Sequence, residues 1–262
     1  MSGVLLQAKG VSKDFGGLRA VRDLNFAIQP GEIFSIIGPN GSGKTTTFNL
    51  VTGFLPVTGG EISFKEERIT GLKPFQICRK GIARTFQLTT LFARNTVLEN
   101  LVIGQRATRE SRILSCILGS PGARQREKEA LEKAHALAEF IGLPRQEMIP
   151  AGALPQGAQK QLSIGLALAS GPELLLLDEP VGGVNMEEIG ALIDLITRIR
   201  KSGITICLIE HKMSVVMNIS DRVMVLSYGE KVAEGSPAEV SQNEKVIKSY
   251  LGERYAASRR QG

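Results

Sequence analysis

The sequence has few of the residues that build disulfides, zinc sites or redox pairs. Its three cysteines are odd in number and lie far apart, at Cys78, Cys116 and Cys207. This spacing gives neither a CxxC pair nor a set of zinc ligands. We therefore expect all three thiols to be reduced and structural.

Long hydrophobic runs are also missing. The longest stretches without a charge, such as residues 45–60, contain 16 residues and are interrupted by Thr, Asn, Gly and Pro. A membrane-spanning helix needs about 20 mostly apolar residues. The N-terminus also lacks the basic start, the apolar stretch and the cleavage site of a secretory signal. These absences predict a protein that does not cross a bilayer and stays in the cytosol.

The chain is nevertheless long and apolar enough to fold. Its 262 residues fit one or two domains, and 42% of them are apolar, which excludes disordered and fibrous classes. The net charge of +6 arises in residues 65–130, where 13 basic residues stand against 6 acidic ones. Composition alone favours a basic face that is simply solvated. The more specific interpretations are that this segment binds anionic lipid headgroups or nucleic acid.

The first two thirds of the chain divide into a strand-rich part and a helical part. Apolar runs and turn residues predict strands at residues 4–8, 24–28 and 33–37, then a helix from about Lys44. Residues 84–170 have helical periodicity and little strand signal, which predicts a helical subdomain. Its expected helices cover residues 97–105, 125–141 and 158–170, and a loop is expected at 106–124.

From Glu173 onward, apolar strands and amphipathic helices alternate. The expected strands cover residues 174–178, 204–210, 222–227 and 231–235, and the expected helices cover 186–201 and 212–219. This order predicts a mostly parallel α/β core.

The strand at residues 33–37 runs directly into GPNGSGKT, which matches GxxxxGK[ST] with a strand before it and a helix after it. Glycines let successive N–H groups point at a polyphosphate, and the helix start adds a positive dipole. Lys44 would bind the β- and γ-phosphates, and the Thr45 hydroxyl would bind Mg²⁺. A glycine-rich turn with an incidental lysine is the weaker alternative. The candidate phosphate-binding residues are Gly38, Pro39, Asn40, Gly41, Ser42, Gly43, Lys44, Thr45 and Thr46.

Polar side chains also follow two apolar strands near the end of the chain. Four leucines lead to Asp178 and Glu179, at the carboxyl end of a strand, where α/β sheets bind ligands. Asp178 would hold Mg²⁺, and Glu179 would orient or deprotonate the attacking water. Without the phosphate loop, this acidic pair would be interpreted as a cap of the next turn. His211 follows the neighbouring strand and can reach the γ-phosphate or the water, although a lone histidine is usually structural.

Together these motifs resemble the nucleotide-binding subunit of an ATP-binding cassette (ABC) transporter over residues 5–252. The resemblance implies an α/β fold with a RecA-like P-loop NTPase core, an N-terminal antiparallel β layer and an inserted helical subdomain. It also implies ATP and Mg²⁺ as cofactors. The implied bounds are one domain at 1–252, with its core at about 1–88 and 171–252 and the helical subdomain at about 89–170, and a flexible basic tail at 253–262.

The resemblance assigns roles to three further residues. Phe15, in KDFGGLRAV, takes the position of the aromatic ring that stacks on adenine, with an ordinary core phenylalanine as an equal alternative. Gln87, in ARTFQ, matches the glutamine that contacts Mg²⁺ and the attacking water and couples the site to the membrane partner. Asn185, in VGGVN, stands where most cassettes have aspartate, and it can also cap the next helix.

The family signature, usually LSGGQ, reads LPQGA in this chain. In the family dimer, this segment of one subunit covers the γ-phosphate bound to the other. Pro155 has neither a hydroxyl nor an N–H, so a charge-assisted hydrogen bond worth about 1.5–3 kcal/mol would be missing. We therefore favour a heterodimer with a second, different ABC ATPase subunit. The signature residues are Leu154, Pro155, Gln156, Gly157 and Ala158.

Longer segments look like those of branched-chain amino acid importer ATPases, namely RTFQLTTLFARNTVLENL, IEHKM, SDRVMVLSYGEKVAEGSPAEV and YLGE. This implies a peripheral ATPase at the cytoplasmic face of the inner (plasma) membrane. Its partners would be two transmembrane permease subunits and, indirectly, an external substrate-binding protein. Urea or amide importers share much of the pattern, and the lipopolysaccharide-export ATPase ends in a similar YLGE.

Two other classes of cassette remain as alternatives. A soluble cassette acting on DNA or ribosomes would use the basic segment, but such proteins carry two cassettes or a long coiled-coil insertion, so we expect no nucleic acid partner. A slowly hydrolysing regulatory cassette fits LPQGA, but four intact residues argue against a fully inactive site, namely Lys44, Asp178, Glu179 and His211.

Overall fold

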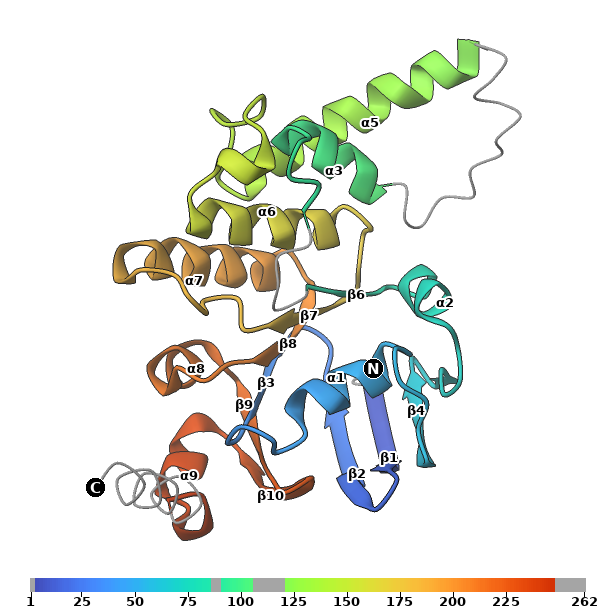
Figure 1. Ribbon diagram of the computed structural model, residues 1–262, viewed down its shortest axis with the longest axis vertical. Helices are drawn as coiled ribbons and strands as arrows, with labels where there is room; N and C mark the ends of the chain where they lie inside the picture. Colours follow the sequence, from blue (N-terminus) through green and yellow to red (C-terminus); the bar gives the residue numbers. More distant parts are fainter. Residues whose placement is uncertain (1–2, 86–90, 106–120, 248–262) are drawn as a thin grey trace.

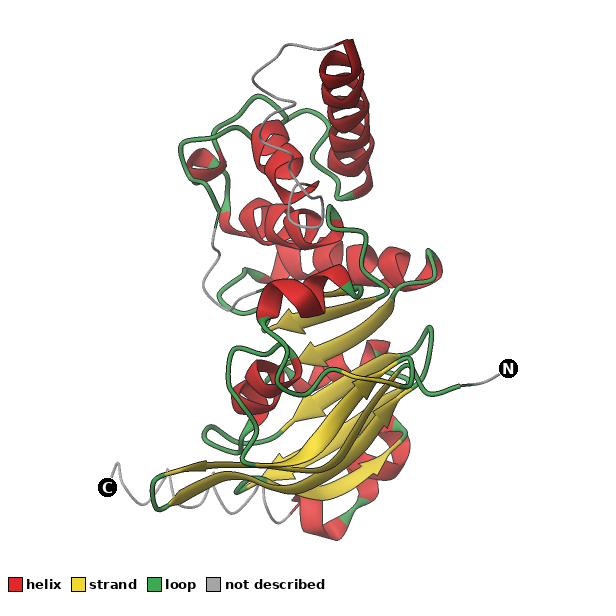
Figure 2. Ribbon diagram, turned by 90° about the vertical axis from the view of Figure 1, so that its right-hand side faces the viewer, coloured by secondary structure: helices red, strands yellow, loops and turns green. Residues whose placement is uncertain are grey.

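Two β-sheets and a group of helices make up the fold (Figures 1 and 2). The computed structural model describes residues 3–85, 91–105 and 121–247. Gln87, Cys116 and the predicted tail at 253–262 lie outside these ranges. The termini of the described chain belong to the half of the molecule that holds the sheets, and α3, α5 and α6 extend from the opposite end (Figure 1).

The first sheet is antiparallel, as the N-terminal layer was expected to be, with strand order β2-β1-β4-β5. Its strands are β1 (Leu6–Phe15), β2 (Leu18–Ile28), β4 (Gly59–Phe64) and β5 (Glu67–Arg68). The strand expected at residues 4–8 overlaps β1 only from Leu6, and the strand expected at 24–28 is the end of the longer β2. The remaining residues of β1 and β2 are polar on the exposed face, which hides them from a pattern of apolar runs.

The second sheet has the order β10-β9-β3-β8-β7-β6, and all of its pairs are parallel except β10 with β9. Its strands are β3 (Ile33–Ile37), β6 (Ile82–Arg84), β7 (Leu174–Asp178), β8 (Thr205–Ile209), β9 (Arg222–Ser227) and β10 (Glu230–Gly235). Every residue of β3, β7 and β8 is buried, which explains their nearly continuous apolar sequences. The predicted mostly parallel core is therefore confirmed.

Helices cover this sheet and build the opposite end of the molecule (Figure 2). They are α1 (Lys44–Val51), α2 (Pro74–Arg79), α3 (Val97–Gln105), α5 (Pro121–Phe140), a 3₁₀ turn at Ala151–Ala153, α6 (Gln156–Leu168), α7 (Met186–Lys201), α8 (Met213–Ile219) and α9 (Pro237–Gln242). None of the helices within the described ranges is long and apolar enough to cross a membrane.

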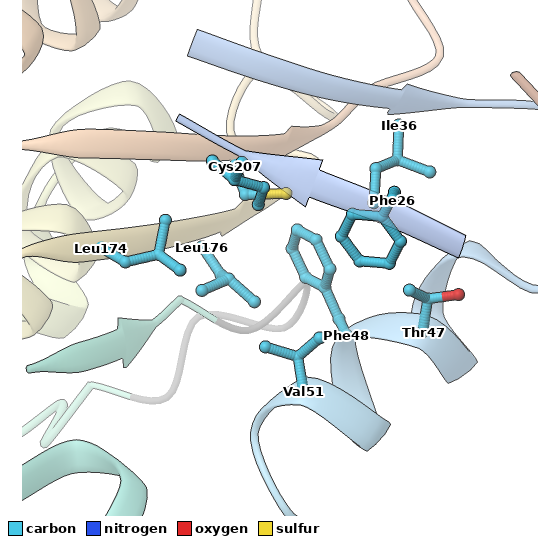
Figure 3. Close-up of a pocket in the computed structure, with 9 residues that line it drawn as sticks. Phe26, Ile36, Thr47, Phe48, Val51, Leu174, Leu176 and Cys207 are labelled. Carbon is cyan, nitrogen blue, oxygen red and sulfur yellow. The ribbon is translucent and has the colours of Figure 1, made fainter. Parts of the chain in front are cut away.

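Two apolar clusters hold these layers together. One cluster joins α3, α5, α6 and α7 to one face of the second sheet. The other joins the first sheet, α1 and the opposite face, where the rings of Phe26 and Phe34 stack with their centres 5.8 Å apart. Figure 3 shows Phe48 and Val51 of α1 beside Leu176 of β7 in this second cluster. The lining there is almost entirely apolar, so this region anchors α1.

Several expected boundaries were wrong. The loop expected at 106–124 ends earlier, because α5 begins at Pro121, a residue that suits the first turn of a helix. The helix expected at 158–170 begins two residues earlier, directly after Pro155. The strands β4, β5 and β6 and the helices α2 and α9 were not predicted, since each has at most six residues and few apolar positions.

Candidate functional site

The loop between β3 and α1 requires glycine at two positions. A Cβ atom on Gly38 would lie 2.2 Å from the carbonyl oxygen of Leu226, and one on Gly43 would lie 2.7 Å from that of Ala20. Gly43 also has φ 102, in the left-handed region that favours glycine. Backbone atoms of neighbouring strands therefore lie directly against this loop. Only glycine at these two positions avoids a clash with them.

The start of α1 has no side-chain cap and carries a buried ammonium group. Gly43 is the N-cap and supplies no side-chain hydrogen bond. The N-terminal end of a helix carries a partial positive charge. Lys44 is buried, and its Nζ donates to the carbonyls of Gly38 at 2.7 Å and Pro39 at 2.9 Å. The Ser42 hydroxyl is buried and makes no hydrogen bond within the described structure. This combination suits an anion at the helix start.

Asp178 ends β7 beside this loop and forms a buried ion pair. Its Oδ2 accepts from Arg84 Nη2 at 2.7 Å, and the two side chains are only 1% and 5% exposed. Arg84 ends β6 and also donates to Asn49 Oδ1 of α1 at 2.6 Å. Its guanidinium lies 5.4 Å from the ring centre of Phe48. Asp178 Oδ1 is buried and accepts no hydrogen bond from any described residue, so it is the oxygen that a further ligand would use.

Glu179 and His211 meet at the same edge of the sheet. The Nε2 atom of His211 lies 2.8 Å from Oε1 of Glu179. β7 and β8 are parallel neighbours with Asp178 opposite Ile209, so the residues that follow each strand are adjacent. Glu179 has φ 50, a left-handed conformation that is rare for residues other than glycine and occurs often at functional sites. The expectation that the two apolar strands are neighbours is confirmed.

Two buried charged residues that the sequence analysis missed complete this edge. Lys160 of α6 donates from Nζ to the carbonyl of Glu179 at 3.3 Å. Burial lowers the pKa of Lys160, and the negative charges of Glu179, Glu210 and Asp178 oppose that shift. Glu210 accepts from the N–H of Val181 at 2.9 Å. Glu210 follows an apolar strand just as Asp178 ends one, and that signal could have found it.

The remaining candidate residues lie around this centre or outside the described ranges. Phe15 ends β1, is 44% exposed and has Lys13 Nζ 5.0 Å from its ring centre, so it is not a core phenylalanine. Asn185 caps α7, with its Oδ1 accepting from the N–H of Glu188 at 2.9 Å. Thr45 is exposed and Thr46 half-buried in the first turn of α1. The structure does not describe Gln87.

The signature residues lead into α6, which begins at Gln156. Pro155 is its N-cap, is exposed and gives no side-chain hydrogen bond, while Leu154, Gly157 and Ala158 are buried. A Cβ atom on Gly157 would lie 2.7 Å from Cδ of Glu188 in α7. An alanine at this position would therefore have to displace the Glu188 side chain.

Two family models match the chain. The family model described as "ABC transporter" matches residues 21–182, and "Branched-chain amino acid ATP-binding cassette transporter" matches residues 230–256. The chain belongs to the ABC transporter family. As a member, it has the P-loop NTPase fold expected from the sequence, binds nucleotide and is the ATPase subunit of a transporter.

Individual ABC proteins resemble the chain over nearly its full length. The high-affinity branched-chain amino acid transport ATP-binding protein LivG of Escherichia coli K12 is 43% identical over 97% of this chain and 100% of its own length. BraF of Pseudomonas aeruginosa is 41% identical with the same coverage. A crystal structure of the ADP conformation of an ABC transporter cassette has a TM-score of 0.84 and 34% identity, covering 96% of this chain and 99% of that one.

Proposed function

We propose that this ABC ATPase energises the import of branched-chain, hydrophobic amino acids. The relatives named for that transport match from end to end, and a family model for it matches residues 230–256. The observation that carries the ATPase mechanism is the 2.8 Å contact between Glu179 and His211 beside the phosphate loop.

The nucleotide would bind across the loop and the start of α1. The backbone N–H groups of the loop and the Lys44 ammonium would hold the phosphates, and Phe15 would stack on the adenine from the exposed end of β1. Lys44 donates to the carbonyls of Gly38 and Pro39, which places its ammonium against the loop that would hold the phosphates.

The polar groups beside the loop fit Mg²⁺. Asp178 Oδ1 and the Ser42 hydroxyl are buried oxygens without a hydrogen-bond partner among the described residues. Thr45, which also carries a hydroxyl, lies in the first turn of α1. Oxygen ligands of this kind, completed by water and phosphate, are what Mg²⁺ prefers. Thr45, Asp178 and Gln87 would hold the ion, which would neutralise charge on the phosphates.

Glu179 and His211 would act on the attacking water. Glu179 would orient the water and accept its proton, and His211 would hold the Glu179 carboxylate and contact the γ-phosphate. Lys160 and the left-handed backbone of Glu179 keep this carboxylate beside His211.

The chain would work as part of a larger assembly. LPQGA at the start of α6 would cover a nucleotide bound to a second cassette, and Asn185 would lie in the connecting D-loop. The missing N–H and hydroxyl of Pro155 favour a different partner cassette over a second copy. Two permease subunits and an external binding protein would complete the transporter, with this subunit peripheral on the cytoplasmic face of the membrane. A helical subdomain at about 89–170, together with Gln87, would transmit the movement to the permease.

The basic segment at residues 65–130 would lie near the membrane and attract anionic lipid. Loss of membrane association whenever the permease is absent would show that lipid contributes little.

An ATPase assay on the full chain, alone and mixed with its partner cassette, tests the proposal. We expect low activity alone, a rise on mixing and a fall by about half or more with Glu179→Gln, because one of two sites loses its base. Glu173→Gln is the matched control, since Glu173 precedes the same strand at the opposite edge of the sheet. Full activity of the chain alone would favour a homodimer in which Pro155 is tolerated. Unchanged activity of Glu179→Gln would refute the assigned role.

Transport is tested in cells that lack the chain. Uptake of labelled leucine should return with the wild-type chain and fail with Lys44→Ala. Restored urea uptake without leucine uptake would replace the substrate assignment.

A further inference from the structure

Glu210 is a buried carboxylate that the proposed roles leave unexplained. It stands between β8 and His211 and is 2% exposed. Burying a carboxylate is costly unless hydrogen bonds and nearby positive charge compensate for the lost water. The contacts of Glu210 therefore indicate what its position requires.

Both carboxylate oxygens accept hydrogen bonds from backbone N–H groups. Oε1 accepts from Val181 at 2.9 Å, and Oε2 accepts from His211 at 3.0 Å and from Lys212 at 3.4 Å. The Lys160 ammonium is the positive charge that interacts with this carboxylate. Among side chains of this length, only an ionised carboxylate accepts hydrogen bonds on both of its terminal atoms and donates none.

These contacts tie together the two loops that carry Glu179 and His211. Val181 lies two residues after Glu179, and the N–H of Glu179 donates to the carbonyl of Ile209 at 2.9 Å. The loop after β7 and the loop after β8 are thus joined by one backbone hydrogen bond and by the Glu210 carboxylate. The contact between Glu179 Oε1 and His211 Nε2 is made across this junction.

We propose that Glu210 is a positioning residue for hydrolysis, which holds the loops after β7 and β8 in the register that brings His211 to Glu179. This inference rests on the proposed roles of Glu179 and His211. Glu210 itself touches neither of the two reacting side-chain atoms, so it acts through the backbone of Val181 and His211. A shift of the two loops against each other would separate the pair without removing the phosphate loop.

Glu210→Gln is the critical variant, because it keeps the size and shape of the side chain. It replaces one of the two carboxylate oxygens by an NH₂ group, which cannot accept a hydrogen bond from a backbone N–H. We expect kcat for ATP to fall about tenfold or more, since small misplacements of catalytic groups are expensive. The KM for ATP and the affinity for a fluorescent ATP analogue should stay within about twofold, because the phosphate loop is untouched.

Glu32→Gln is the matched control. Glu32 is also a buried carboxylate, 7% exposed, and accepts from the N–H of Gln29 at 2.8 Å and from Arg222. It precedes β3 at the opposite edge of the same sheet. This variant should lower the thermal midpoint as Glu210→Gln does but leave kcat within about twofold. Equal losses of kcat in both variants, or an unchanged kcat in Glu210→Gln, would overturn the proposal.

A spectroscopic measurement separates positioning from general destabilisation. The chain has two histidines, so the ¹⁵N resonances of the His211 imidazole are readily distinguished from those of His135. We expect Glu210→Gln to shift the Nε2 resonance of His211 and Glu32→Gln to leave it in place; the opposite pattern contradicts the inference.

Both variants are measured with the chain in complex with its partner cassette, beside Glu179→Gln and His211→Ala. If the latter two keep full activity, the proposed roles fail. If they lose activity and Glu210→Gln does not, only the positioning role fails.

Discussion

Replacing Arg84 by methionine should destabilise the protein far more than breaking an ion pair on its surface. The pair between Arg84 and Asp178 has side chains that are 5% and 1% exposed. Methionine keeps much of the length of the side chain but leaves a buried carboxylate without its cation. Removing one partner of a buried pair costs about 3–5 kcal/mol. In a protein of this size, about 2 °C per kcal/mol then predicts a thermal midpoint lower by about 6–10 °C.

A double-mutant cycle isolates the pair, since Arg84 also contacts Asn49 and Phe48. Urea unfolding of Arg84→Met, Asp178→Asn and the double variant should give a coupling energy of about 1.5 kcal/mol or more. The comparison pair is Lys65 with Glu173, whose side chains are 49% and 50% exposed, and whose coupling should be about 0.2–1 kcal/mol.

Two results would refute the reasoning. Arg84→Met could cost less than about 1 kcal/mol, which would mean that water or another cation compensates Asp178. Alternatively, the two pairs could show equal coupling, which would mean that burial does not strengthen the Arg84 contact.

Three further outcomes follow from other parts of the structure. Gly43→Ala should weaken binding of a fluorescent ATP analogue about tenfold or more, because the added Cβ atom would lie 2.7 Å from the carbonyl oxygen of Ala20. Gly41→Ala should weaken binding less, because its added Cβ atom would have no neighbour within 4 Å. Equal effects of the two variants would contradict this steric argument. Asn185→Ala should lower the free energy of unfolding in urea by about 0.5–2 kcal/mol by removing the cap of α7, and Asn185→Asp should restore it. Burial raises the pKa of the Cys207 thiol, so iodoacetamide at pH 8 should modify it only after unfolding, as mass spectrometry of its peptide would detect; labelling of the native chain would show that β8 opens.

The candidate site at this edge of the sheet could be predicted from sequence because its signals are local. The phosphate loop stands between an apolar strand and a helix, and Asp178, Glu179 and His211 each end or follow an apolar strand. Parallel neighbouring strands bring their carboxyl ends to one edge, so a correct strand assignment placed Glu179 near His211.

Contacts between distant segments could not be predicted in the same way. Arg84 and Asp178 are 94 residues apart, and their pairing requires that β6 lies next to β7. β6 could not be predicted, because three residues that end in a charge do not form a recognisable pattern. Lys160 faces Glu179 because of the packing of α6 on the sheet, which no local sequence pattern reports.

The distribution of buried charge gives a sequence-independent argument for the location of the site. Six Lys, Asp or Glu residues are buried within the described chain, and four of them gather at the carboxyl ends of β3, β7 and β8. These four are Lys44, Lys160, Asp178 and Glu210. Because each buried charge opposes folding, a fold selected for stability alone would disperse or replace them. Their concentration where the phosphate loop, Glu179 and His211 meet is explained by a function that requires fixed charges around a polyphosphate.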